Sequence, residues 1–282
     1  LAAPAADDLF HRVWSMSPSL PQLRSSAEAA GHDRQYLRIL GDDPVHELER
    51  RTVPELLAAQ AEMMSGEVTL KNFAPAGDSP SLPSHVLRAA SADPRPVVVG
   101  TTRDEMYLFT AFDPERKGWT DEHVEREFGR RFDDPSPAIE AYRAHRPDVG
   151  ASRLVSAMQT DEMFRAPVQR LATKRSGRST PTWVYEFHQT STAFGGRLGA
   201  FHGLDIPFVF HNLTRRGAEM ATGGGDQLVA VADMFSGALL RFARHGDPGW
   251  PTYDTGTRAT QIIGPEGEVR SDPERSLREL WT

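Results

Sequence analysis

Apolar residues recur along the chain with two periods, one typical of amphipathic helices and one typical of buried strands. Spacings of three and four residues predict helices over 21–40 and 52–64, and about three further helical pieces over 119–176, the last of them beginning at Thr160. A longer helix is predicted over 226–246, where Gly246 is a natural residue for ending it. Because helical stretches alternate with short apolar runs, the pattern predicts a sheet with helices on its faces.

Short runs of β-branched and aromatic residues mark the expected strands. The runs are "HRVWSMS" at 11–17, "RPVVVGTT" at 95–102, "PTWVYEFHQ" at 181–189 and "TRATQIIG" at 257–264. Long helical stretches between them favour parallel pairing, so the expected fold class is α/β. The run "GAFHGLDIPFVF" at 199–210 is expected to be a buried strand or a tight join between a loop and a strand, and 72–96, rich in Pro, Ser, Gly and Asp, a surface loop.

Composition and charge exclude several classes of protein. The 32 Lys and Arg against 39 Asp and Glu give a formal charge of −7, which argues against a general nucleic-acid-binding surface. No run approaches the ~18 consecutive apolar residues of a membrane span. The chain has no cysteine, which excludes disulfides and thiolate metal sites. This favours a cytoplasmic location and leaves secretion open. Oligomeric state has no signature in the sequence.

The chain begins at Leu1, and its first methionine is Met16. Its opening residues lack the basic and apolar regions of a signal peptide. The visible strands are also few for an α/β domain of this length. We therefore expect the sequence to be part of a longer chain that contributes further strands to the sheet.

Two titratable residues follow successive predicted strands. Glu105 comes a few residues after the strand at 95–102, and His202 comes after the strand at 181–189. Taken alone, Glu105 is typical of a solvated loop and His202 of a packed, hydrogen-bonded histidine. Together they follow the chain order acid then histidine of an α/β-hydrolase triad, in which the acid orients the imidazole and the imidazole acts as base.

A metal site is the weaker alternative for the histidines. His188, His202 and His211 are close in sequence, but no H-x-x-x-H or H-E-x-x-H pair is present and no carboxylate accompanies them in a ligand-like pattern. The Gly-rich stretch at 221–226 lacks the pattern of a phosphate loop. We therefore expect no metal and no cofactor.

Several stretches, in order, resemble the type-B carboxylesterases, the branch of the α/β-hydrolases that includes para-nitrobenzyl esterases and cholinesterases. "VVVGTTRDEMYLF" resembles their strand and acid loop, "TDEMFRAPVQRLA" a T-D-x-x-F-x-x-P helix, and "GAFHGLDIPFVF" the catalytic-histidine segment. "LLRFARHGDPGWPTYD" resembles their F-A-x-x-G-D-P…W-P-x-Y signature, and "LAAPAADDLFHRVWSMSPS" the stretch after the nucleophile. The resemblance covers nearly the whole chain.

This resemblance implies a role for three residues. Glu105 matches the triad acid, His202 the general base, and Ser17 a serine that supports the acid by hydrogen bonding. Pro18 stands where the family has Gly after that serine, and Met106 where Gly follows the acid. The resemblance also implies that residues 1–282 form a single, partial domain, the C-terminal portion of an α/β-hydrolase. It implies further that a helical insert at about 119–176 covers the mouth of the active site.

The family's nucleophile lies in a G-x-S-x-G elbow, and no such motif occurs in the 282 residues. The implied activity is hydrolysis of small carboxylic esters through an acyl-enzyme, and we expect this chain alone to be inactive. Two alternatives remain: a catalytically silent binding protein of the same fold, and a truncated remnant. Apolar residues that could line a substrate pocket, although most are expected in the core, are Phe109, Phe112, Trp119, Phe128, Met158, Met163 and Phe201.

Overall fold

The computed structural model describes residues 1–41, 43–64, 73–178 and 180–282. Its contacts divide the chain into two compact units. Unit 1 comprises Leu1–Asp7 and Leu20–Asp93, and unit 2 comprises Asp8–Ser19 and Pro94–Thr282.

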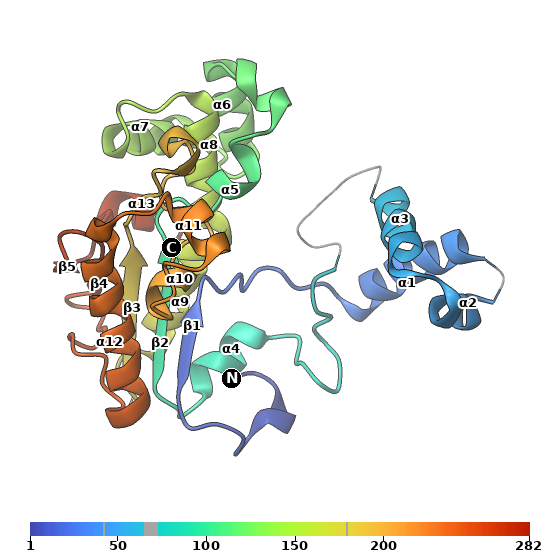
Figure 1. Cartoon of the computed structure of the whole chain (residues 1–282), viewed down its shortest axis with the longest axis horizontal. Helices are drawn as coiled ribbons and strands as arrows, with labels where there is room; N and C mark the ends of the chain where they lie inside the picture. Colours follow the sequence, from blue (N-terminus) through green and yellow to red (C-terminus); the bar gives the residue numbers. More distant parts are fainter. Residues whose placement is uncertain (42, 65–72, 179) are drawn as a thin grey trace. The chain divides into compact units, whose positions relative to one another are not determined.

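Unit 2 is built on a five-stranded sheet with the order β1-β2-β3-β4-β5 (Figure 1). The first four strands pair in parallel and β5 pairs with β4 in antiparallel fashion. This mostly parallel sheet with helices on its faces confirms the predicted α/β class. The strands are β1 (Val13–Met16), β2 (Val97–Thr102), β3 (Thr182–Phe187), β4 (Ala259–Ile263) and β5 (Val269–Ser271).

Alternate residues of β3 face two different environments, as the two-residue period of a strand requires. Trp183, Tyr185 and Phe187 belong to an aromatic core that includes Phe235 and other buried residues of α12 (Val229–His245). The ring centroids of Tyr185 and Phe235 are 5.1 Å apart. Helix α12 therefore covers this face of the sheet by apolar packing, and Figure 1 shows it lying along the strands.

Two residues at the alternate positions of β3, Thr182 and Glu186, bind arginines instead. Arg175, at the end of α9 (Ala166–Arg175), donates from Nε to Thr182 Oγ1 at 2.9 Å. Arg165 lies 3.3 Å from Glu186 and is also paired with Asp161. Burial of such charges is tolerated only when they are paired, so this face is held by ion pairs and the aromatic face by packing.

One close approach inside the sheet requires a glycine. A Cβ on Gly100 of β2 would lie 2.3 Å from Cδ1 of the Tyr185 ring on the neighbouring strand. Gly100 also accepts a hydrogen bond from the Ser17 N–H at 2.8 Å, just beyond β1. The glycine thus lets the Tyr185 ring lie flat against β2 while the main chain of β2 holds Ser17.

The remaining helices of unit 2 include a cluster that packs through its own core. Residues of α6, α7 and α8 form this second core, to which Leu277 of α13 contributes. Helix α8 continues into α9 through a π-helical segment, Asp161–Arg165. The α-helices not yet given are α5 (Tyr107–Thr110), α6 (Asp121–Gly129), α7 (Ser136–His145), α8 (Ala151–Thr160), α10 (Ile206–Val209), α11 (Arg216–Thr222) and α13 (Arg275–Glu279).

Unit 1 is helical in its described residues. Its α-helices are α1 (Ser26–Leu40), α2 (Pro44–Arg50), α3 (Val53–Met63) and α4 (Val86–Ala92), and α1 packs with α2 and α3. Ser25 and Thr52 begin α1 and α3 with reciprocal contacts to Glu28 and Glu55, three residues on. These two helices confirm the periodicity, except that α1 begins at Ser26 rather than residue 21.

Three sequence-based expectations about local structure are wrong. Within the loop predicted over 72–96, the described residues contain α4; residue 72 lies outside the described residues. The run 199–210 forms a loop and the short helix α10 rather than a strand, since Pro207 fits a first helical turn. The last helical piece of 119–176 does not start at Thr160, because α8 runs through it into the π-helical segment.

Among the residues that the structure describes, no helix combines the length and hydropathy needed to cross a bilayer. The expectation of a cytoplasmic location rests on composition and stays a prediction.

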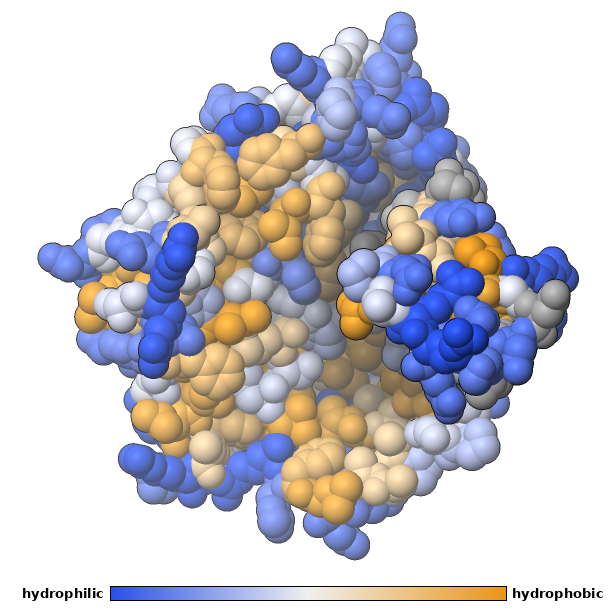
Figure 2. Space-filling view, turned by 45° about the vertical axis from the view of Figure 1, so that its right-hand side comes forward, coloured by the Kyte–Doolittle hydropathy of each residue, from blue (hydrophilic) through white to orange (hydrophobic). Residues whose placement is uncertain are grey.

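In Figure 2, apolar side chains gather over much of the face of unit 2 that is turned to the viewer.

Candidate active site

The structure brings Ser17, Glu105 and His202 together at the C-terminal edge of the parallel strands. Ser17 follows β1, Glu105 follows β2, and His202 lies in the loop between β3 and α10. Loops at this edge of a parallel sheet are the usual place for a functional site. All three residues belong to unit 2.

Glu105 is fully buried, and both of its carboxylate oxygens accept hydrogen bonds. Oε1 accepts from Ser17 Oγ at 2.5 Å and from the Thr102 N–H at 2.7 Å. Oε2 lies 2.6 Å from Nδ1 of His202. A carboxylate held in one orientation by three contacts can fix the orientation of the imidazole in turn.

His202 is oriented so that one ring nitrogen is occupied and the other is available. Because Nδ1 faces a carboxylate oxygen, the neutral tautomer carries its proton on Nδ1 and a lone pair on Nε2. The side chain is 35% exposed, with Phe109 and Phe164 ring centroids 5.6 and 5.2 Å from its own. The hydrogen bond to Glu105 raises the pKa of His202, against the lowering effect of burial. The residue is therefore equipped to accept a proton at Nε2.

Asp104 joins the acid loop to the histidine loop. Its N–H donates to the Ala200 carbonyl at 2.9 Å, and its Oδ2 accepts from the Ala200 N–H at 2.8 Å. Arg103 pairs with the same carboxylate at 2.8 Å. Gly199 has a φ of +60°, and a Cβ there would lie 2.4 Å from Asp104 Oδ2. This pairing fixes the chain two residues before His202.

Asp205 is a buried carboxyl near the site that the sequence did not single out. Burial and the nearby charge of Glu105 raise the pKa of Asp205 to about 7. The hydroxyl of Tyr185 lies 3.1 Å from its Oδ2. The available signal is a carboxylate inside an apolar run, three residues after His202.

Four of the seven residues expected to line a pocket belong to or pack against a core instead. Phe128 and Met158 are buried in the second core, among α6, α7 and α8, with Trp119 packed against it. Phe201 is buried in the aromatic core. The carbonyl of Met163 accepts a hydrogen bond from Ser19 Oγ at 3.3 Å. Phe109 packs against the His202 ring, and Phe112 lines a cavity described below. Phe164, which was not among the expected residues, contacts the ring of His202 as well.

Within the described ranges, no group of three or more histidine and carboxylate side chains is placed to hold a metal ion. His188 pairs with Glu186 at 3.1 Å, and His211 pairs with Asp233 at 2.7 Å. His202 is bound to Glu105, so the three histidines have different partners.

In the described part of the chain, no hydroxyl group is hydrogen-bonded to Nε2 of His202; the ring's bond is to Glu105. This agrees with the lack of a G-x-S-x-G motif in the sequence. The array of Ser17, Glu105 and His202 thus contains a supported acid and an oriented base, without a nucleophile.

Comparisons with known proteins place nearly the whole chain in one family. The model of the "Carboxylesterase family" matches residues 1–270. The phenmedipham hydrolase of Pseudarthrobacter oxydans is 31% identical over 286 residues, which is 95% of this chain and 57% of that protein. The para-nitrobenzyl esterase of Bacillus subtilis is 28% identical over 296 residues, covering 99% of this chain and 58% of the relative.

Solved structures agree with the sequence relatives. A carboxylesterase of Geobacillus stearothermophilus superposes with a TM-score of 0.84 at 27% identity, covering 99% of this chain and 60% of that one. A para-nitrobenzyl esterase gives a TM-score of 0.76 at 26% identity, covering 100% of this chain and 60% of the other. The chain therefore spans less than two thirds of the proteins it matches. These likenesses confirm the α/β-hydrolase fold and the resemblance stated above: the chain belongs to the carboxylesterase family.

Proposed function

We propose that this chain supplies the acid and the general base of a serine carboxylesterase. The observation that carries the proposal is the 2.6 Å contact between Glu105 Oε2 and His202 Nδ1, with Nε2 left free. In this role Glu105 is the orienting acid, His202 the base, and Ser17 a positioning residue that holds the carboxylate through Oε1. Family membership supports ester hydrolysis as the reaction class.

The reaction follows from this geometry once a serine hydroxyl is placed at Nε2. The serine oxygen attacks the ester carbonyl while His202 accepts its proton, and the protonated imidazole is stabilised by Glu105. His202 then returns the proton to the departing alcohol, leaving an acyl-enzyme. Water repeats the sequence and releases the carboxylic acid.

The nucleophile and the oxyanion-hole donors are not among the 282 residues, since the sequence has no G-x-S-x-G elbow. We therefore propose that the chain alone does not hydrolyse esters, and that the activity belongs to a longer protein. The substrates proposed are small carboxylic esters, with no nucleic-acid partner. The helices at about 119–176 are proposed to cover the mouth of the site.

The first test is to read the coding DNA upstream of Leu1 in the same frame. A G-x-S-x-G motif shortly before Leu1 is the expected result. The longer product is then assayed on 4-nitrophenyl butyrate, with His202→Ala expected to lower kcat by on the order of 10⁴–10⁶-fold. His211→Ala is the matched control, because His211 is an exposed histidine that is also paired with a carboxylate. A continuous frame without the elbow serine, or equal activity of the two variants, would reject the proposal.

A further inference from the structure

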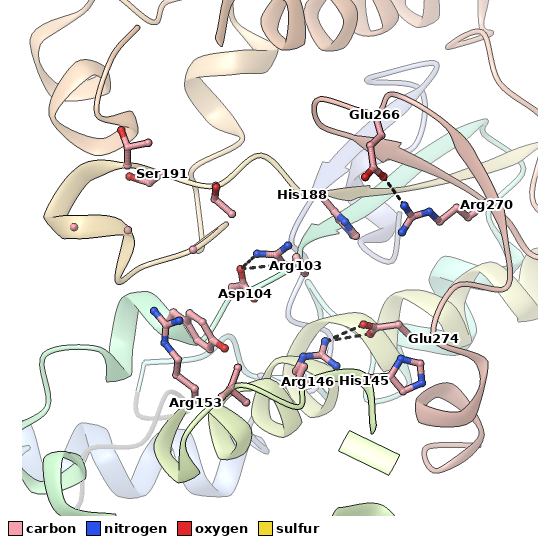
Figure 3. A pocket seen from close by; sticks show the side chains of 17 residues that line it. Arg103, Asp104, His145, Arg146, Arg153, His188, Ser191, Glu266, Arg270 and Glu274 are labelled. Carbon is pink, nitrogen blue, oxygen red and sulfur yellow. Dashed lines mark hydrogen bonds and ion pairs between the residues drawn. The ribbon is translucent and has the colours of Figure 1, made fainter. Parts of the chain in front are cut away.

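Two cavities of unit 2 share Arg153 in their walls. The first, of about 840 Å³, is lined by several arginines, three of which are each paired with a carboxylate. These pairs are Arg103–Asp104, Arg146–Glu274 and Arg270–Glu266. Figure 3 draws them with dashed lines, whereas Arg153 stands apart from every carboxylate labelled in the view. Among the residues that the structure describes, Arg153 therefore has no carboxylate partner to neutralise its charge.

The second cavity, of about 690 Å³, lies along the end of α5 and the turn after it, and we name it the α5 cavity. Lys117, Arg153 and Arg197 line it, and none of the three is paired with a carboxylate of the described residues. Asp113 is the carboxylate in its wall, and it lies 3.5 Å from Arg116. A chain with a net charge of −7 thus gathers three unneutralised cations around one cavity.

The two arginines of the α5 cavity are held in place by neutral groups. Arg153 donates from Nη2 to the Arg197 carbonyl at 2.6 Å and lies 4.8 Å from the centroid of the Tyr107 ring. Arg197 donates from Nη2 to the Ala111 carbonyl at 3.2 Å and lies 5.3 Å from the centroid of the Phe112 ring. A guanidinium has five N–H donors, so each arginine keeps several for an oxyanion.

Exposed aromatic rings connect this cavity to the candidate base. Phe109 of α5 is 45% exposed and contacts the His202 ring, with 5.6 Å between centroids. Phe112, three residues on, lines the cavity; it is 54% exposed and packs edge-on against Phe194, which is 58% exposed. Phe109 and Phe112 are three residues apart, which is close to one helical turn and a rise of about 5 Å. An apolar path thus leads from His202 to the three cations.

We propose that the α5 cavity binds an oxyanion group, a carboxylate or phosphate, on the part of an ester substrate distant from the ester bond. The apolar middle of such a substrate lies along Phe109 and Phe112, and Arg153 and Arg197 bind its anionic end. This assignment of a substrate class rests on the proposed esterase function. The binding site itself is testable without catalysis.

Binding is measured on the 282-residue chain by isothermal titration with 4-phenylbutyrate, and with its uncharged analogue 4-phenylbutyramide. We expect saturable binding of the anion, weakened by added salt, and at least tenfold weaker binding of the amide. The double variant Arg153→Gln/Arg197→Gln is expected to weaken anion binding by about tenfold or more, since hydrogen bonds to charged groups are lost. Arg244→Gln, a change of an exposed arginine on α12 outside the cavity, is the matched control.

Equal binding of anion and amide, no binding of either, or an unchanged double variant would overturn the site. His202→Ala should leave binding intact, which separates this result from any failure of catalysis. For the substrate class, the longer product is compared on 4-nitrophenyl hemiglutarate and 4-nitrophenyl butyrate. The double variant should lower kcat/KM for the hemiglutarate alone. If the longer product hydrolyses both esters and the double variant affects them equally, the anionic substrate class is rejected and the proposed esterase function is kept. If the protein binds the anion but hydrolyses neither ester, both the esterase function and the substrate class are rejected.

Discussion

Replacing Gly100 by Ala tests whether the approach of Tyr185 to β2 limits the packing of the sheet. The added Cβ would lie 2.3–2.4 Å from three ring carbons of Tyr185, far inside van der Waals contact. The backbone of Gly100 is not in the left-handed region, so an alanine fits its conformation and the cost comes from the ring. Tyr185 is fully buried among aromatic residues and has little room to move. Overpacking of this kind lowers the free energy of unfolding by about 1–3 kcal/mol.

The assay is urea unfolding followed by tryptophan fluorescence, which reports on unit 2 alone. All five tryptophans of the chain are in this unit: Trp14, Trp119, Trp183, Trp250 and Trp281. Gly237→Ala is the matched control, because this glycine lies within α12 and a Cβ there meets no atom within 4 Å. That change should raise the free energy of unfolding by up to about 1 kcal/mol through helix propensity.

A double-mutant cycle separates the ring contact from other effects of the added methyl group. In a Tyr185→Ala background the ring is gone, and Gly100→Ala should then cost almost nothing. A penalty that persists in that background would refute the reasoning, as would an unchanged urea midpoint for Gly100→Ala alone. Because the Gly100 carbonyl binds the Ser17 N–H, the single variant should also weaken the support of Glu105 by Ser17, seen as a changed His202 titration by NMR.

Three further predictions concern buried charges. Glu105→Gln removes the main cause that raises the pKa of His202, so NMR titration should show a lower pKa for His202. In the wild type the Glu105–His202 pair stabilises the fold at low pH, and this stabilisation is lost as the pH rises through the folded-state pKa of His202; it should be absent in the variant. The pKa of Asp205 is raised to about 7, so the free energy of unfolding of the wild type should fall as the pH rises from about 4 to about 7. Asp205→Asn should flatten this dependence of the free energy of unfolding on pH, measured by urea unfolding, and an unchanged dependence contradicts the prediction. Arg165→Met leaves Glu186 buried without its main cation and should cost about 3–5 kcal/mol at pH 7, with Arg244→Met near zero. Burial raises the pKa of Glu186, but Arg165, together with His188, outweighs it and lowers that pKa to about 2, so this loss should shrink as the pH falls from about 4.5 towards 2.

The sequence predicts the parts of the fold in which hydrophobic periodicity and burial coincide. β2 and β3 are buried at every position, and their β-branched and aromatic runs are visible in the sequence. β5 has only three residues, two of them exposed, so no apolar signal marks it. The run 199–210 forms a loop and α10 rather than a strand, and the sequence cannot show this because a short apolar run fits a strand and a helical turn equally well; only the tertiary contacts decide between them.

The candidate site shows a similar division. The contact between Glu105 and His202 could be predicted because their order along the chain and the surrounding motifs carry the information. The role of Asp104 could not, since a carboxylate after a strand is usually solvated, and its bond to Ala200 depends on how two distant loops meet. The cations of the α5 cavity come from three separate segments of the chain, so no local pattern predicts their convergence.

The two paired strands β1 and β2 are separated in the chain by most of unit 1, residues 20–93. The entropy of closing a flexible loop grows only with the logarithm of its length, so doubling or halving this connection changes the closure cost by about 0.6 kcal/mol. Register between β1 and β2 is set instead by their own hydrogen bonds and by the bond from Ser17 to Gly100. The chain between the strands is therefore a place where evolution or an engineer can lengthen, shorten or exchange residues while the edge of the sheet that holds Ser17, Glu105 and His202 is kept.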